Sequence, residues 1–184
     1  MRMTNTQSHV YPIVMTAMMM CIIMVSIVLF RIPIPFTQGY VNLSDAMIFL
    51  AVIMLGYKYG AIAAALGSML GDLMAGFAMW APWTFCIKGC MALIFGLIIQ
   101  STLARTTRGF ISVEIIGMIL SGLVMTAGYY LAEGIMYGNF IVAALGIPWN
   151  IAQFACGIVL AVALATALSR TSLRSVMAYR SPIQ

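Results

Sequence analysis

Six polar side chains stand inside or at the edges of long apolar segments of this sequence, where a polar group is costly. They are Asp45, Asp72, Lys88, Glu133, Asn150 and Gln153. Polar and charged residues in such surroundings usually mark a ligand site, an ion pathway or an internal ion pair. A carboxylate beside two amides offers hydrogen-bond donors and acceptors, which suit the polar edge of a ring or a set of hydroxyl groups. These residue types therefore indicate binding of a small solute.

Glu133, Asn150 and Gln153 are the strongest candidates for ligand contact. Asn150 and Gln153 are three residues apart, so on a helix both fall on one face. A carboxylate left unpaired beside them is costly unless a ligand or water satisfies it. For Asp72 we favour an internal ion pair with Lys88 that joins two neighbouring helices, with ligand contact as the alternative. Lys88 is also a candidate ligand residue.

Aromatic side chains gather at the same level as the polar group. They are Tyr40, Trp80, Trp83, Tyr129, Tyr130, Tyr137 and Trp149. An aromatic belt at a membrane surface is one explanation, although such belts normally have two rims and all three tryptophans fall on one side. The other is a pocket wall that stacks on a flat ligand, with Trp83 or Trp149 as the expected contact. Tyr40 and Tyr130 are further candidates for the pocket.

Few residues of the sequence indicate catalysis or metal binding. The single histidine, His9, stands in the polar N-terminal segment, which leaves little for histidine-based chemistry. Cys86 and Cys90 share a helix face, but no second pair supports a metal site, so we expect small packing residues. No glycine-rich phosphate loop ending in Lys-Ser/Thr occurs. We expect no enzyme activity, metal or cofactor. An intramembrane enzyme with an Asp45–Asp72 dyad is the alternative class.

The elements that hold these residues must lie in a lipid bilayer. Of 184 residues, 64% are hydrophobic and only 7% are charged, against about 25% charged in soluble domains. The net charge of +5 does not indicate nucleic acid, because the basic residues are scattered among loops. We predict one all-α membrane domain over residues 1–184. Its six transmembrane helices are expected at about 11–30, 42–55, 60–79, 83–103, 111–132 and 148–168.

Two interruptions connect the first three helices. Arg31 to Val41 contains two prolines and a glycine and is expected to be a loop that can close over the site as a lid. Gly56-Tyr-Lys-Tyr-Gly60 is expected to be a tight turn. The helix before that turn has only about 14 residues, too few to span a bilayer upright.

Loop charges predict the orientation. With six helices, the two termini and the second and fourth loops share one side, and the basic residues on it are Arg2, Lys58, Arg105, Arg108, Arg170, Arg174 and Arg180. The opposite loops carry only Arg31. Because positive loops stay inside, both termini are expected to be cytoplasmic. The polar group then lies near the outer surface.

Small residues recur at the spacing of close helix contacts. These are Gly67 with Gly71, and Gly117 with Gly122. We favour packing inside the bundle, with docking of another membrane subunit as the alternative. Ala17-x-x-x-Cys21 is a looser small-residue face on the first helix.

Four stretches, in this order, resemble the substrate-binding S components of energy-coupling factor (ECF) vitamin transporters. They are Tyr40-Val-Asn-Leu-Ser-Asp45, Gly67-Ser-Met-Leu-Gly-Asp72-Leu, Trp80-Ala-Pro-Trp-Thr-Phe-Cys-Ile-Lys88-Gly-Cys-Met and Ile147-Pro-Trp-Asn150-Ile-Ala-Gln153. The resemblance implies a multi-pass protein of a prokaryotic plasma membrane that binds a vitamin at its outer face. Such a subunit docks on a membrane scaffold subunit driven by two ATPase subunits, so ATP hydrolysis belongs to partners. The family's Ala-x-x-x-Ala docking motif corresponds here to Ala17 and Cys21.

The resemblance leaves the cargo open between riboflavin-type and hydroxymethylpyrimidine-type branches. We favour a compact ring with hydroxymethyl groups, hydroxymethylpyrimidine or pyridoxine, which suits Glu133, Asn150, Gln153 and an aromatic wall. Riboflavin needs a larger pocket. A self-sufficient secondary transporter is a further alternative, although no internal repeat is visible.

Overall fold

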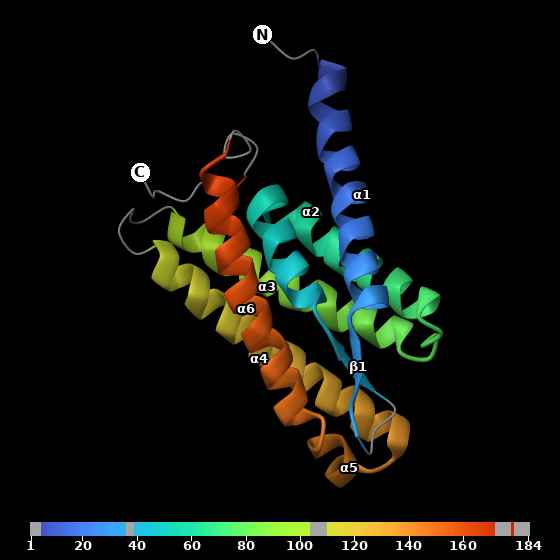
Figure 1. Cartoon of the computed structure of the whole chain (residues 1–184). Coiled ribbons are helices and arrows are strands. Elements are labelled where there is room, and N and C mark those ends of the chain that lie inside the picture. Colours follow the sequence, from blue (N-terminus) through green and yellow to red (C-terminus); the bar gives the residue numbers. More distant parts are fainter. Residues whose placement is uncertain (1–4, 36–38, 104–109, 172–177, 179–184) are drawn as a thin grey trace.

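The computed structural model describes residues 5–35, 39–103, 110–171 and 178. Its helices are α1 (Asn5–Leu29), α2 (Ser44–Met74), α3 (Ala81–Leu103), α4 (Phe110–Tyr137), α5 (Phe140–Ala144) and α6 (Ile147–Ser169). Two short antiparallel strands, β1 (Arg31–Pro33) and β2 (Tyr40–Asn42), lie between α1 and α2. The protein is a helical bundle with one small hairpin (Figure 1).

Among the described residues, five helices are long and apolar enough to cross a bilayer. The longest, α2, has 31 residues and is not straight: Gly56 has φ 79° and ψ 174°, far from helical values. A Cβ on Gly60 would lie 2.7 Å from the Cα of Val52, so the chain folds back at this point. The break that the sequence predicts over residues 56–60 is therefore concentrated at Gly56.

Helix ends differ from the expected positions. α1 begins at Asn5 rather than near residue 11 and continues through Pro12, and the polar segment before Pro12 contains no proline or glycine. α2 ends at Met74 rather than near residue 79, since Gly76 takes a φ of 85°. α4 continues to Tyr137, and Gly138 follows with a φ of 64°. The short helix α5 was not predicted.

Residues 31–42 include a hairpin rather than forming only a loop. The register pairs Arg31 with Asn42, Ile32 with Val41 and Pro33 with Tyr40. Prolines indicated a loop, but an isolated two-stranded hairpin has only edge strands, which tolerate proline. Because successive side chains of a strand point to opposite faces, Tyr40 and Asn42 share one face of the hairpin.

Small residues allow the helices to approach closely. A Cβ on Gly67 would lie 2.9 Å from a backbone oxygen of α1, and one on Gly71 would lie 2.8 Å from the Ile27 side chain. Gly117 lies against α3, and Gly122 lies against α6. Packing inside the bundle, the interpretation favoured from the spacing, is confirmed for all four glycines.

The two ends of the bundle differ. The β1–β2 hairpin and α5 lie at one end, and the N-terminal end of α1 and the C-terminal end of α6 lie at the other (Figure 1). Most of the basic residues behind the predicted orientation lie outside the described residues: Arg2, Arg105, Arg108, Arg174 and Arg180. We call the end that carries the hairpin and α5 the hairpin end. The polar residues converge there.

Candidate functional site

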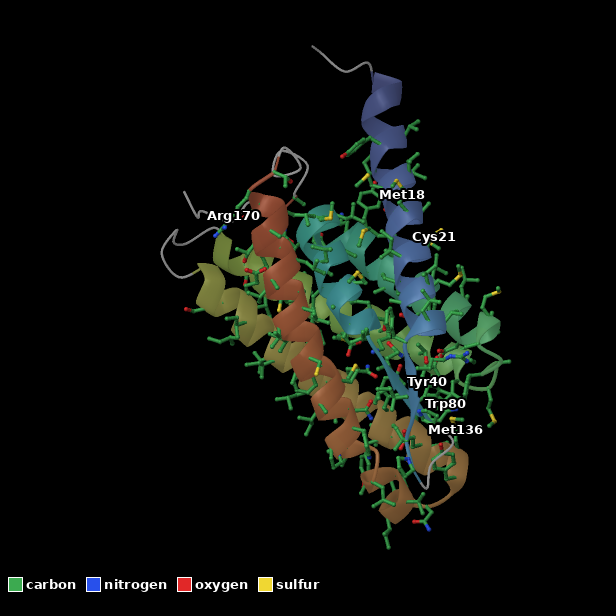
Figure 2. The ribbon with its side chains drawn as sticks, in the orientation of Figure 1. Met18, Cys21, Tyr40, Trp80, Met136 and Arg170 are labelled. Atoms are coloured by element: carbon green, nitrogen blue, oxygen red, sulfur yellow. The ribbon has the colours of Figure 1, made fainter. Side chains whose placement is uncertain are left out.

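A small polar cavity lies under the β1–β2 hairpin. It is lined by Ile34, Gly39, Tyr40, Asn42, Asp72, Trp80, Thr84, Tyr129, Glu133, Asn150 and Gln153. These residues come from the hairpin, α2, α3, α4 and α6, and Figure 2 shows Tyr40 and Trp80 close together at this end. The cavity volume of about 20 Å³ holds roughly one water molecule. The lining groups must therefore move apart to admit a ring-shaped ligand.

Glu133 brings an unsatisfied carboxylate to this cavity. Its side chain is 2% exposed, and Oε2 has no hydrogen-bond partner within the described structure. Gly146, which caps α6, makes room for it, because a Cβ there would lie 2.7 Å from Oε2. A buried acceptor without a donor costs roughly 1–3 kcal/mol. The position therefore favours a ligand that donates a hydrogen bond.

Asn150 and Gln153 reach the cavity from the start of α6. The Asn150 side-chain amide donates to the Gly146 carbonyl oxygen at 3.1 Å. Gln153 is held at both ends of its amide. Its Nε2 donates to Asp45 Oδ2, and its Oε1 accepts the backbone N–H of Asn42, each at 2.9 Å. The Gln153 amide is thus fixed in orientation and ties the hairpin and α2 to α6.

The buried ion pair is not the one expected. Lys88 pairs with Asp45 rather than with Asp72, and the two side chains are 1% and 0% exposed. The Lys88 ammonium also lies 5.5 Å from the centroid of the Tyr129 ring. Because α2 folds back at Gly56, both of its carboxylates come near α3, and sequence spacing cannot rank them. The predicted Asp72–Lys88 pair is wrong.

Asp72 instead holds the hairpin. The Tyr40 hydroxyl donates to Asp72 Oδ1, while Asp72 Oδ2 has no hydrogen-bond partner among the described groups. Burial, reinforced by the negative charge of Asp72, raises the pKa of the Tyr40 phenol far above its usual value. The phenol therefore keeps its proton and remains a donor. The Tyr40 ring also packs on Phe77, with 4.6 Å between ring centroids.

Trp80 and Tyr129 form the aromatic wall of the cavity. Trp80 is 5% exposed, and its ring centroid lies 6.3 Å from that of Tyr129. The Tyr129 hydroxyl donates to the Thr84 hydroxyl oxygen at 3.3 Å. Both rings were noted in the sequence, but neither was chosen over Trp83 or Trp149.

Four residues expected to contact the ligand lie away from the cavity lining: Trp83, Lys88, Tyr130 and Trp149. Trp83 packs partly buried against the core, and Tyr130 packs against Phe140 of α5. Trp149 instead lines a groove of about 410 Å³ between the end of α1, the hairpin and α6, which shares Asn42 and Gln153 with the cavity. That groove is mostly apolar, so it suits a water-soluble ring less well than the polar cavity.

Asn42 and Thr84 line the cavity but were not singled out from the sequence. The sequence features that could have indicated these two residues are weak. Asn42 follows Tyr40 at the spacing that places both on one face of a strand, but a strand was not predicted here. Thr84 precedes Lys88 by one helical turn, so the two share a face of α3.

Ala17 and Cys21 lie on an exposed face of α1, and Figure 2 shows Cys21 beside Met18 on that side. Cys86 and Cys90 are also exposed. They are therefore not packed inside the bundle as expected, because Lys88 and Met91 take the inward-facing positions of α3.

Sequence relatives share much of the chain. Residues 7–170 match the family described as ECF-type riboflavin transporter, S component. The thiamine precursor transporter HmpT of Lactococcus lactis subsp. cremoris (strain MG1363) is 34% identical over 146 residues, 79% of this chain and 80% of that protein. An uncharacterized protein of the gap 3′ region of Pyrococcus woesei is 39% identical over 114 residues, 62% of this chain and 72% of that protein.

Solved structures share the fold. The S component of a bacterial ECF transporter superposes with a TM-score of 0.66 at 25% identity, covering 88% of this chain and 99% of that one. The S component for biotin from an ECF-type ABC transporter gives a TM-score of 0.64 at 18% identity, covering 95% and 99%. At 18% identity, the similarity to the biotin S component supports a shared fold only. From the family match and these relatives together, the chain belongs to the ECF-type riboflavin transporter S-component family, and so to the S components of ECF vitamin transporters.

Proposed function

We propose that this chain captures a compact, water-soluble ring compound, hydroxymethylpyrimidine or pyridoxine, in the cavity under the hairpin. One observation carries the proposal: the buried, unsatisfied Glu133 carboxylate lines the cavity together with Asn150 and Gln153. Trp80 supplies a flat surface for the ring. The relative described as a thiamine precursor transporter supports this cargo, since hydroxymethylpyrimidine is a precursor of thiamine. Riboflavin is the alternative cargo and requires a wider opening of the same cavity.

The cavity opens at the outer face of a prokaryotic plasma membrane in this proposal. The chain crosses the membrane six times, counting the two halves of α2 separately, and both termini are cytoplasmic. Green fluorescent protein fused to either terminus should therefore fluoresce in cells, whereas alkaline phosphatase fused there should be inactive. Active phosphatase at either terminus would contradict this orientation.

Delivery of the cargo requires partners. The chain docks through the α1 face that carries Ala17 and Cys21 on a membrane scaffold subunit, and two ATPase subunits supply the energy. The bundle presents small side chains at these two positions, where a partner helix can approach closely.

The binding proposal is tested by titrating the purified chain in detergent and following tryptophan fluorescence. The ligands are hydroxymethylpyrimidine, pyridoxine, thiamine, riboflavin and pantothenate. Saturable quenching is expected with one of the two compact rings, because Trp80 lies on the cavity wall. A Trp80→Phe variant should lose most of this signal, although Trp83 and Trp149 remain.

Glu133→Gln is the decisive variant. Loss of a hydrogen bond to a charged group costs about 1.5–3 kcal/mol, so binding should weaken by roughly 10- to 100-fold. Glu114→Gln is the matched control, because Glu114 is another buried acid of α4 that does not line the cavity. Unchanged binding of every compact ring in Glu133→Gln would overturn the assignment of the site.

A further inference from the structure

Two carboxylates of the cavity each keep one oxygen without a hydrogen bond. Asp72 is 3% exposed and Glu133 is 2% exposed. The unsatisfied atoms, Asp72 Oδ2 and Glu133 Oε2, are both buried. The two residues come from different helices, α2 and α4, and line the same cavity. An acceptor is therefore available at two separate places on its wall.

In the described part of the chain, the structure shows no ion pair between a basic side chain and either of these carboxylates. Lys88 is bound to Asp45, and Arg31 donates to the Ala75 carbonyl oxygen at 3.0 Å. Arg170 lies at the opposite end of the molecule from the hairpin (Figure 2). Lys58 lies over the ring of its neighbour Tyr57, in the turn that follows Gly56.

The groups that contact the two carboxylates directly are uncharged, although the charge of Lys88 also acts on Asp72. Tyr40 donates to Asp72, and the Thr84 hydroxyl also lies near it. Glu133 lies against the Gly146 backbone. Counting Asp45, the described residues in and behind the cavity include three carboxylates and one ammonium, that of Lys88. The site therefore has more negative than positive groups.

We propose that the ligand supplies the missing donors and positive charge: a heteroaromatic ring that carries an amino group and a protonated ring nitrogen and donates to both Asp72 and Glu133. The inference rests on the proposed function, since it takes the same cavity as the vitamin site. Charge-assisted hydrogen bonds are roughly twice as strong as neutral ones. An amino group beside a protonated ring nitrogen presents two neighbouring donors, which suits a carboxylate.

The aromatic wall favours the same class of ligand. The face of an indole ring attracts a cationic ring, and Trp80 lies on the cavity wall, whereas Tyr129 already lies under the Lys88 ammonium. Anionic compounds are disfavoured, because a carboxylate or phosphate in the cavity meets like charges away from water. Pantothenate is therefore expected not to bind.

The proposal is tested by calorimetric titration of the purified full-length chain with two pyrimidines of nearly equal size. One is 4-amino-5-hydroxymethyl-2-methylpyrimidine, and the other has a methyl group in place of the amino group, which keeps the size and removes the donors. A site built around a ligand's hydrogen-bond donors can reject an analogue that lacks them by about 10⁴-fold. The amino compound is expected to bind at least about 100-fold more tightly.

Glu133→Gln and Asp72→Asn should each reduce this preference to below about tenfold. Both substitutions keep the side-chain size, and the amide introduced by Asp72→Asn still offers an acceptor to Tyr40. Glu114→Gln should keep the full preference. Thermal unfolding of each variant, followed by intrinsic fluorescence, checks that the fold is retained.

Three outcomes overturn the proposal in different ways. Equal binding of the two pyrimidines removes the selection by carboxylates but leaves vitamin binding intact. Failure of every vitamin to bind overturns the proposed function as well. A saturable response to sodium or calcium chloride alone, lost in Glu133→Gln, assigns the carboxylates to an inorganic cation instead.

Discussion

The Lys88 ammonium group is buried inside the bundle, and side chains from three other helices surround it. Asp45 of α2 forms the ion pair, and the Met125 sulfur of α4 lies 3.0 Å from the ammonium. Gln153 of α6 donates to the second oxygen of Asp45, so both oxygens of that carboxylate are satisfied. A buried ion pair is tolerated when its remaining hydrogen-bonding groups have partners, as they do here.

At the scale of residues, Lys88→Met should strongly destabilise the protein. It leaves Asp45 buried without its partner, which costs about 3–5 kcal/mol in comparable pairs. The double variant Asp45→Asn/Lys88→Met should recover most of this loss, because it removes both charges and leaves an acceptor for Gln153. Thermal unfolding in detergent measures both effects. A single variant as stable as the parent would contradict this role.

At the scale of elements, hydrogen bonds hold the β1–β2 hairpin to the bundle, in addition to the packing of Tyr40 on Phe77. Tyr40 donates to Asp72, the Asn42 backbone N–H donates to Gln153 at 2.9 Å, and Arg31 donates to the end of α2 at 3.0 Å. Because the cavity beneath has room for roughly one water, some of these contacts must break for a ligand to enter. We therefore predict that the hairpin acts as the lid of the site.

Tyr40→Phe should accelerate ligand association. The variant removes one charge-assisted contact worth about 1.5–3 kcal/mol, so the open hairpin becomes at least about tenfold more populated. Stopped-flow tryptophan fluorescence measures the association rate, and hydrogen exchange over residues 31–42 reports opening. Tyr130→Phe is the control, since Tyr130 packs against α5 and does not line the cavity. An unchanged association rate would show that entry does not require release of this contact.

The contact between α1 and α2 depends on glycine. In Gly67→Ala the new Cβ would lie 2.9 Å from a backbone oxygen of Met20, and backbone cannot yield as a flexible side chain can. Overpacking of this kind costs about 1–3 kcal/mol, which should lower the unfolding temperature. Ala155→Leu adds more volume on an exposed face of α6 and should have little effect. Equal unfolding temperatures for the two variants would contradict the close approach.

At the scale of the whole molecule, α1 divides into an inner and an outer face. Ile23 and Ile27 are fully buried against the bundle, whereas Ala17 and Cys21 are exposed. The outer face is apolar and carries small residues at helix-contact spacing, which suits a second membrane helix. This arrangement supports the proposed docking surface.

Ala17→Leu should therefore weaken assembly with the scaffold subunit and slow vitamin uptake, while vitamin binding by the isolated chain stays unchanged. Copurification with the scaffold and uptake in cells measure the first two effects. Ala127→Leu makes the same change on an exposed face of α4 and should assemble normally. If Ala17→Leu assembles as well as the control, the docking surface lies elsewhere.

Some features of the fold could be predicted from short stretches of sequence, because they depend on the hydropathy and backbone freedom of residues close together in the chain. Apolar length marked the membrane helices, and the glycine spacing of Gly67 with Gly71 indicated packing that the structure confirms. The break at residues 56–60 was visible because glycine alone readily takes a φ of 79°. The hairpin was missed, since two three-residue strands carry almost no periodic signal and prolines indicate a loop.

The sequence by itself determined that this is a membrane-embedded helical bundle with most of its buried polar residues near one end and Glu114 as an exception, because composition and hydropathy are properties of single segments. The tertiary structure decided which of those polar residues meet. Lys88 pairs with Asp45, and Asp72 is left to Tyr40 and the cavity, because the fold-back at Gly56 sets the position of both carboxylates. Such pairing depends on distances between segments far apart in the chain, which no spacing within one segment records.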